Sequence, residues 1–211
     1  MKIFDIDGPL YKFMLTFTNI VKLNFCWILG TLIGLGTTVG VSTVAAFDVG
    51  LRMVRNEEGY IGKQFVGAWK SNFKQGFPLG LINLLVAYAV YLDLAIFHAS
   101  EKGPILLLIW GILFGIIGVT SFLYAYPQTA RYQNRLFKII RNSFRISTRF
   151  PLRTLLLIIC LAIEVLSFLW NYTTMAIGVL IGPAALILTV STFAMPIFDK
   201  IEENNRKLKE E

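Results

Sequence analysis

The sequence predicts an all-α integral membrane protein, a helical bundle of about six transmembrane helices with two cytoplasmic interfacial amphipathic helices. Three observations support this fold class: a high apolar content, long apolar stretches, and clustering of the positive charges. Of the 211 residues, 55% are hydrophobic and only 16% are charged, and the mean hydropathy is +0.64. This balance is too apolar for a disordered chain and too poor in charge to cover a soluble core. Soluble single-domain enzymes are therefore disfavoured, and intrinsic disorder is excluded.

Six apolar stretches are candidate membrane spans, because a spanning helix needs about 20 mostly apolar residues. The stretch 38–51 is the weakest candidate, since it is short and carries Asp48. We retain it as a span because residues 13–54 are too long for one helix to cross at about 1.5 Å per residue. The predicted spans are 13–34, 38–51, 78–98, 104–126, 152–173 and 176–198.

The positive charges predict the topology. Twelve of the twenty Lys and Arg residues lie in the segments 52–77 and 127–153, and loops rich in these residues stay on the cytoplasmic side. We therefore predict cytoplasmic loops at 52–77 and 127–151, a cytoplasmic tail at 199–211, and short external turns near 34–36, 101–104 and 173–174. Six spans place both termini on the cytoplasmic side of the cell membrane, whereas five place the N-terminus outside. We favour six.

Each basic loop has the pattern of a helix that lies in the membrane interface, with aromatic residues on one side and basic residues on another. In the first loop the aromatic residues recur every four positions: Phe65, Trp69, Phe73 and Phe77. In the second loop Phe137, Ile140 and Phe144 share one side of a helix, opposite six basic residues. Nucleic-acid binding would need basic residues that are free of the bilayer, so no nucleic acid is expected as a partner.

The exposed positions of these loops are candidate partner-docking residues. Glu57 and Glu58 precede the first amphipathic segment, and we expect them in the polar first turn of its helix, where carboxylates suit the helix dipole. The full candidate set is Glu57, Glu58, Phe65, Trp69, Phe73, Phe137, Arg141, Phe144 and Arg145.

The two loops also resemble one another, which indicates an internal duplication. Residues 69–74 are followed by Phe77-Pro78, and the similar residues 140–145 are followed by Phe150-Pro151. Each unit predicts an amphipathic helix, an aromatic–proline step and a rising span, because proline suits the first turn of a helix. Pro183 and Pro196 are expected to kink or end the last span.

The run from Leu51 to Tyr60, with its Glu-Glu-Gly-Tyr block, and the aromatic–basic run that follows closely resemble the YesL family of bacterial membrane proteins. The Asp-Gly-Pro-Leu at 7–10 and the Tyr-Leu-Asp at 91–93 are similar too, so the resemblance covers essentially the whole chain. It implies a small polytopic protein whose gene accompanies carbohydrate-uptake ABC transporters and glycan-degrading enzymes. No activity is settled for that family, so the resemblance implies no catalytic residues.

Four ionisable residues lie within or near the predicted hydrocarbon region: Lys22, Asp48, Asp93 and Glu164. Charges there are costly and usually face a partner or water, so they indicate either a polar path or buried ion pairs. Arg52 is placed to pair with Asp48 at i, i+4, and Lys22 with Glu164 is the other pairing to test. Glycines spaced for close helix packing occur at 111, 115 and 118 and at 30, 34, 36 and 40.

The sequence contains no Gly-rich phosphate loop, zinc-protease motif, Ser-His-Asp set or Cys-x-x-Cys, and its single histidine is at a span end. We therefore expect no enzyme activity, no cofactor and no metal site. The preferred hypothesis is an accessory subunit of a carbohydrate ABC uptake transporter that contacts the lipid bilayer and the permease or nucleotide-binding subunit. The alternative is an independent carrier or channel with a polar path through Asp93 and Glu164. A weaker third hypothesis is a sensor whose basic helices respond to anionic lipid.

Overall fold

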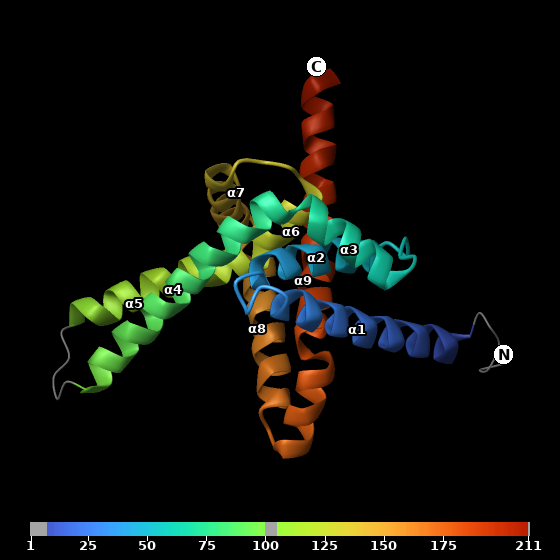
Figure 1. Ribbon diagram of the computed structural model, residues 1–211. Helices are drawn as coiled ribbons and strands as arrows, with labels where there is room; N and C mark the ends of the chain where they lie inside the picture. The colour runs from blue at the N-terminus through green and yellow to red at the C-terminus, as the bar shows by residue number, and fades with distance from the viewer. Residues whose placement is uncertain (1–7, 100–104, 211) are drawn as a thin grey trace.

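The fold is built from helices that extend outward from a short central one (Figure 1). The computed structural model describes residues 8–99 and 105–210, and these residues form helices and turns without any strand. The elements in chain order are α1 (Pro9–Leu32), α2 (Val39–Val54), α3 (Ile61–Ser71), α4 (Phe73–Ala99), α5 (Ile105–Thr120), the π-helical turn η1 (Ser121–Ala125), α6 (Tyr126–Arg131), α7 (Leu136–Arg149), α8 (Pro151–Phe168) and α9 (Tyr172–Glu210).

Five helical stretches of the described residues are long and apolar enough to cross a membrane, which confirms the all-α membrane fold class. They are Leu10–Leu32, Phe73–Ala99, Leu108–Arg131, Pro151–Phe168 and Tyr172–Leu208. The third stretch runs without a break through α5, η1 and α6. Between 11% and 28% of the most apolar window of each stretch is buried inside the chain. Most of this apolar surface is therefore left for lipid or another membrane protein to cover.

The sixth apolar stretch, 38–51, forms the central helix α2. Its 16 residues span about 24 Å at about 1.5 Å per residue, less than the hydrocarbon thickness of roughly 30 Å. Twelve of these residues are buried, so that α2 is enclosed by protein on nearly all sides. A helix that is apolar all round is typical of a buried position as well as of a span.

Glycines bring α2 and α4 into direct backbone contact. A Cβ added to Gly40 would lie 2.3 Å from the Cα atom of Gly80 and 2.4 Å from the carbonyl oxygen of Gly76. The two α4 glycines are four residues apart, the spacing that lets membrane helices approach closely. Towards the other end of α2, Gly50 lies against Ser191 of α9. The glycine spacing in the sequence indicates Gly40 as a packing position but not its two partners.

The glycines of the predicted span 104–126 pack against α4 only in part. A Cβ added to Gly111 would lie 3.7 Å from the Cβ of Asp93, and one added to Gly118 would lie 3.4 Å from Val86. Gly115 has no atom within 4 Å on its open side. It lines an apolar groove of about 530 Å³ that runs between α1, α2, α4 and α5.

The helix ends define two connections, and the second of them corrects a predicted turn. α2 ends in a Schellman motif, in which Asn56 has a φ of 55° and the Glu57 amide donates to the Arg52 carbonyl at 2.9 Å. The last turn lies at 169–171 rather than at 173–174, because the Asn171 side chain accepts a hydrogen bond from the Thr174 amide at 2.9 Å and caps α9. The predicted turn at 101–104 lies outside the described residues.

The prolines of the two similar units occupy different positions. Pro151 begins α8, as predicted, whereas α4 begins at Phe73 and carries Pro78 inside the helix. The aromatic–proline step therefore starts a span in the second unit but not in the first. α9 continues through Pro183 and Pro196, so neither proline ends the last span.

Three arms extend from α2 in different directions in Figure 1: α1, the α4–α5 hairpin and the α8–α9 hairpin. The C-terminal part of α9 projects beyond the hairpin and leaves the bundle near α6 and α7. Arg55 at the end of α2 and Arg131 at the end of α6 meet this part of α9 at Asp199. We call this region of the molecule the basic end.

Candidate functional site

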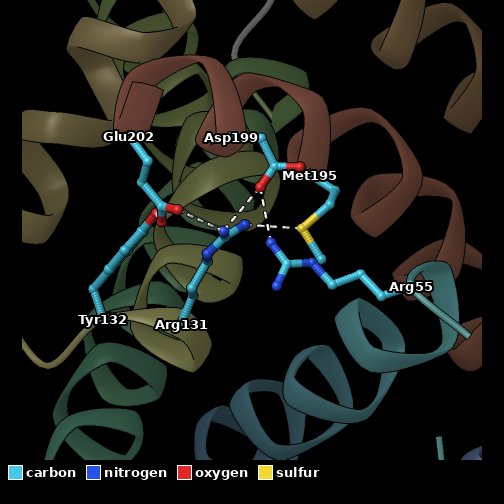
Figure 2. A network of polar contacts seen from close by, with 6 residues as sticks. All are labelled: Arg55, Arg131, Tyr132, Met195, Asp199 and Glu202. Carbon is cyan, nitrogen blue, oxygen red and sulfur yellow. Dashed lines mark hydrogen bonds and ion pairs between the residues drawn. The ribbon is translucent and has the colours of Figure 1, made fainter. Parts of the chain in front are cut away.

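A network of polar side chains joins three helices at the basic end (Figure 2). Asp199 of α9 accepts hydrogen bonds from Arg55 at 2.8 Å and from Arg131 at 2.9 Å. Arg131 also pairs with Glu202, almost one turn further along α9, at 2.9 Å. Arg55 and Arg131 thus share the Asp199 carboxylate, and Arg131 also holds a second carboxylate. These ion pairs fasten the ends of α2 and α6 to α9.

Arg131 is the centre of this network. Its side chain is only 14% exposed, and one of its guanidinium nitrogens lies 2.9 Å from the sulfur of Met195. The guanidinium carbon also lies 5.7 Å from the centroid of the Tyr132 ring and 5.8 Å from that of Phe198. Aromatic faces and carboxylates together compensate the charge of a largely buried guanidinium. Losing Arg131 would leave both carboxylates without this partner.

The phenol of Tyr132 completes the network by donating a hydrogen bond to Glu202. Burial, and then the hydrogen bond to the Glu202 carboxylate, raise the pKa of Tyr132 above its ordinary value. The phenol therefore stays protonated at neutral pH and keeps its hydrogen for donation. This bond ties the connection between α6 and α7 to α9.

This network was not predicted, because the sequence pattern assigns Arg55 to the topology signal and Arg131 to that signal and to the basic side of the second loop helix. A local signal was available: Asp199 and Glu202 are three residues apart and share one face of a helix, directly after a predicted span. Which basic residues those carboxylates meet depends on packing between distant segments, such as the 144 residues between Arg55 and Asp199.

α7 has three faces, and one of them packs against the rest of the chain. The packed face carries the buried residues Ile139, Ser143 and Ile146. Phe137 and Phe144 lie roughly 140° around the helix from that face, at about 100° per residue, and they are 77% and 47% exposed. The third face is basic and exposed, with Lys138, Arg141, Arg145 and Arg149. Within the described part of the chain, the aromatic face is therefore left uncovered and the basic face is exposed.

The aromatic stripe of the first loop is used mainly inside the chain. Phe65 is 3% exposed and lies against Gly30 of α1, and the indole of Trp69 donates to Ser42 of α2 at 3.3 Å. Phe73 belongs to α4, is 37% exposed, and its ring centroid is 5.2 Å from that of Trp69. Of the predicted docking aromatics in this loop, Phe73 alone is exposed.

The two acidic docking candidates lie before α3 rather than in its first turn. α3 begins at Ile61 and has no acidic residue in its first turn, so the expected dipole contact is not formed. Glu57 is exposed and lines a polar cavity of about 260 Å³ together with Asp48 and Arg52. One carboxylate oxygen of Glu58 is buried and has no hydrogen-bond partner among the described residues.

The two ion pairs considered for the spans have different outcomes. Asp48 and Arg52 pair at 3.0 Å, which confirms the i, i+4 prediction. Lys22 is exposed on α1, whereas Glu164 of α8 accepts a hydrogen bond from Thr189 of α9 at 3.0 Å. A pair between Lys22 and Glu164 is not among the ion pairs of the described residues, so that pairing is wrong.

The remaining intramembrane carboxylates lie in different arms. Asp93 of α4 faces Gly111 within the α4–α5 hairpin, and Glu164 faces Thr189 within the α8–α9 hairpin. The two hairpins point in different directions in Figure 1. Each carboxylate therefore serves its own hairpin, and the structure does not bring the two together in one polar path.

A buried side-chain amide, which the sequence does not single out, satisfies the backbone groups of α9 that Pro183 leaves without helical partners. Proline has no amide hydrogen, so the carbonyl of Val179, four residues earlier, loses its donor within the helix. Asn24 of α1 is 1% exposed and donates to the carbonyls of Val179 and Leu180, each at 2.9 Å. Its side-chain oxygen accepts a hydrogen bond from the Ala184 amide at 3.3 Å. Neighbouring helices commonly satisfy the backbone at prolines in membrane helices in this way.

Among the described residues, no group of three or more His, Cys, Asp or Glu side chains is placed to hold a metal ion. The single histidine, His98, lies near the end of α4 with its ring beside Phe97. The polar side chains that converge at Asp199 and at Pro183 are engaged with one another or with the backbone, and they hold helices together.

These features define the class of the molecule as an all-helical membrane protein with a polar network at one end. Residues 20–94 match the model of a family described as "Protein of unknown function, DUF624". This region runs from the middle of α1 to α4 and contains Asn24, Gly40 and Phe65. The chain is also 24% identical over 150 residues to the uncharacterised protein YteU of Bacillus subtilis (strain 168), which covers 70% of this chain and 68% of YteU. No solved structure matches it significantly.

Proposed function

We propose that this protein is a non-catalytic membrane subunit that assembles with a carbohydrate ABC uptake transporter in a bacterial cell membrane. The observation that carries the proposal is the free surface of α7, which presents an aromatic and a basic face away from the chain. Aromatic and arginine side chains are the groups that protein interfaces favour. A membrane-embedded partner with acidic groups at the interface would match both faces.

The chemistry of the described residues agrees with a binding role. At the basic end, Asp199 and Glu202 are engaged by the network of two arginines and one tyrosine. Glu164 is engaged by Thr189. Groups held in this way fasten helices rather than transfer protons to a substrate. The choice of a carbohydrate transporter rests on the resemblance to the YesL family, whose genes accompany such transporters. With the basic loops on the cytoplasmic side, α7 would meet the permease or nucleotide-binding subunit there.

Affinity purification from host membranes tests this proposal. The tagged protein, solubilised in a mild detergent, should recover ABC permease or nucleotide-binding subunits, measured by quantitative mass spectrometry. The double variant Phe137→Ser/Phe144→Ser should recover at least about tenfold less, which corresponds to a loss of about 1.4 kcal/mol of binding free energy. The matched control is Leu208→Ser, because Leu208 is 71% exposed but lies on the tail of α9. Recovery of the wild type without transporter subunits would refute the proposal, as would equal recovery by the double variant.

The alternative function, an independent carrier or channel through Asp93 and Glu164, is not favoured by a specific observation. The two carboxylates lie in separate hairpins and have separate neighbours. A liposome flux assay that compares the wild type with Asp93→Asn and Glu164→Gln tests this function directly. A flux through the wild type that either variant abolishes would support the carrier or channel function.

A further inference from the structure

A cavity at the basic end is lined by polar groups that the chain itself does not use. It has a volume of about 400 Å³ and lies between the connection from α6 to α7, α7 itself and the C-terminal part of α9. Arg145 and Arg149 line it from one side of α7, one turn apart. Three amide side chains complete its polar wall: Asn134, Asn142 and Asn205.

The polar groups of this cavity are free to bind a ligand. Neither Arg145 nor Arg149 has an acidic partner among the described residues. The three asparagine side chains form no hydrogen bond within the described part of the chain. The acid at the edge of the cavity, Glu202, is already held by Arg131 and Tyr132, so its charge is largely compensated.

This set of groups matches a phosphate ester. Two unpaired guanidinium groups bind the oxygens of an oxyanion in a bidentate manner, which is why arginine is favoured for phosphate recognition. Amide side chains both donate and accept, so they suit the hydroxyl and ester oxygens that accompany a phosphate. A volume of about 400 Å³ lies within the usual size range of small-ligand pockets.

The position of the cavity is at the level of lipid headgroups. α8 begins at Pro151, two residues after Arg149, so the cavity lies where that span starts. The predicted last span ends at Phe198, and Phe198 and Ile201 form the apolar part of the lining. The headgroup of an adjacent lipid would therefore meet the arginines while its acyl chains stay in the bilayer.

We propose that this cavity is a binding site for a phosphate ester, in which Arg145 and Arg149 hold the phosphate oxygens. Two sources carry this chemistry, an anionic phospholipid headgroup and a soluble phosphate ester, and the level of the cavity favours the lipid. The site shares Arg145 and Arg149 with the basic face of α7. It is tested on purified protein without any partner, so its failure and the failure of the proposed docking can be told apart.

The experiment uses the full chain purified in a zwitterionic detergent. Thermal unfolding and binding titrations are measured with phosphatidylglycerol, phosphatidylcholine, glycerol phosphate and inorganic phosphate. Arg145→Gln/Arg149→Gln removes the two cavity arginines. Arg135→Gln/Lys138→Gln is the matched control, because it removes the same charge from exposed positions of the same segment outside the cavity lining.

We expect phosphatidylglycerol, but not phosphatidylcholine, to raise the unfolding temperature of the wild type and of the control. The cavity variant should lose this shift, and its Kd for phosphatidylglycerol should rise at least about tenfold, against less than about threefold for the control. If the cavity variant does not fold, Arg149→Lys replaces it, because lysine keeps the positive charge but lacks the planar guanidinium group. The Kd of Arg149→Lys for phosphatidylglycerol should still rise.

Each other result decides the proposal. An equal stabilisation by glycerol phosphate would keep the phosphate site and assign it to a soluble ester. An equal loss in the cavity variant and the control would show diffuse attraction to negative charge and overturn the site. The absence of any stabilisation of the wild type by the phosphate compounds would overturn it as well.

Discussion

Replacing Asn24 with leucine should destabilise the protein, because the side chain supplies three hydrogen bonds where Pro183 interrupts α9. Two of these bonds are 2.9 Å long and the third is 3.3 Å. Hydrogen bonds between membrane helices contribute about 0.6 kcal/mol each on average and about 1.7 kcal/mol at most. The contact between Asn24 and α9 is buried, and its loss leaves backbone groups of α9 unpaired. We therefore expect Asn24→Leu to lower the free energy of unfolding by about 2–3 kcal/mol.

A double-mutant cycle with Pro183→Ala isolates this contact. Alanine restores an amide that donates to Val179, and it allows the Ala184 amide to return to the Leu180 carbonyl. Asn24 then has little left to satisfy, so Asn24→Leu should cost at least about 1 kcal/mol less in the Pro183→Ala background.

The free energy of unfolding in mixed micelles, followed by titration with a denaturing detergent, measures each corner of this cycle. Thr18→Val is a suitable control, because Thr18 lies on the same helix but donates an exposed hydrogen bond to the Met14 carbonyl within that helix. That substitution should change the free energy of unfolding by less than about 0.5 kcal/mol. Equal costs of Asn24→Leu in the two backgrounds would refute the assignment of Asn24 to the break at Pro183.

Three further predictions follow from the packing and the topology of the chain. Gly40→Ala should destabilise the fold by about 2–3 kcal/mol, because its Cβ would clash with the α4 backbone and overpack the contact. The control Gly115→Ala should leave the free energy of unfolding unchanged in the same assay, because its Cβ would meet no atom within 4 Å. Tyr132→Phe should lower the unfolding temperature at neutral pH. Because the pKa of the phenol is raised in the folded state, the difference in unfolding temperature from the wild type should be full below about pH 10 and should shrink at higher pH. A difference that stays constant above about pH 10 would contradict this. The side of the N-terminus can be tested with Lys2→Cys in a chain whose natural cysteines are replaced by alanine. This cysteine should react with a membrane-impermeant maleimide added outside intact cells, as five spans predict. Labelling only after lysis would support six spans.

The features that the sequence predicted well depend on composition or on short spacing. The low charge and long apolar stretches indicate a membrane bundle whatever the packing, and the pair between Asp48 and Arg52 needs only one turn of helix. The amphipathic pattern of α7 was likewise visible from periodicity. Its packed face was not, because the small stripe of Ile139, Ser143 and Ile146 is less conspicuous than the aromatic stripe that stays exposed.

The features that the sequence did not predict depend on which distant segments meet. In a soluble helix the most apolar stripe faces the core, but in a membrane lipid covers apolar side chains as well as protein does. Hydrophobicity therefore cannot tell Phe65, which is buried, from Phe137, which is exposed. The bonds of Asn24 and Asp199 reach across 155 and 144 residues, respectively. Local patterns carry no information about such partners.

The packing of α2 bears on the number of spans. If α2 crossed the membrane, its two ends would lie on opposite sides. Its first turn, at Gly40, contacts Gly76 and Gly80 at the beginning of α4, and its last residues reach α9, where Arg55 meets Asp199. The beginning of α4 and this part of α9 are both predicted to lie on the cytoplasmic side, because they adjoin the first basic loop and the tail.

α1 provides an independent argument for the same arrangement. Phe65, within the first basic loop, packs against Gly30 near the end of α1, and Trp69 of the same helix bonds Ser42 near the start of α2. A cytoplasmic loop can make these contacts only if α1 ends on the cytoplasmic side. If the basic loops are cytoplasmic, α2 stays at that side as a buried helix between the inner ends of the arms. The five-span alternative, which predicts an external N-terminus, therefore agrees with the packing of α2 better than the six spans that we favoured from length.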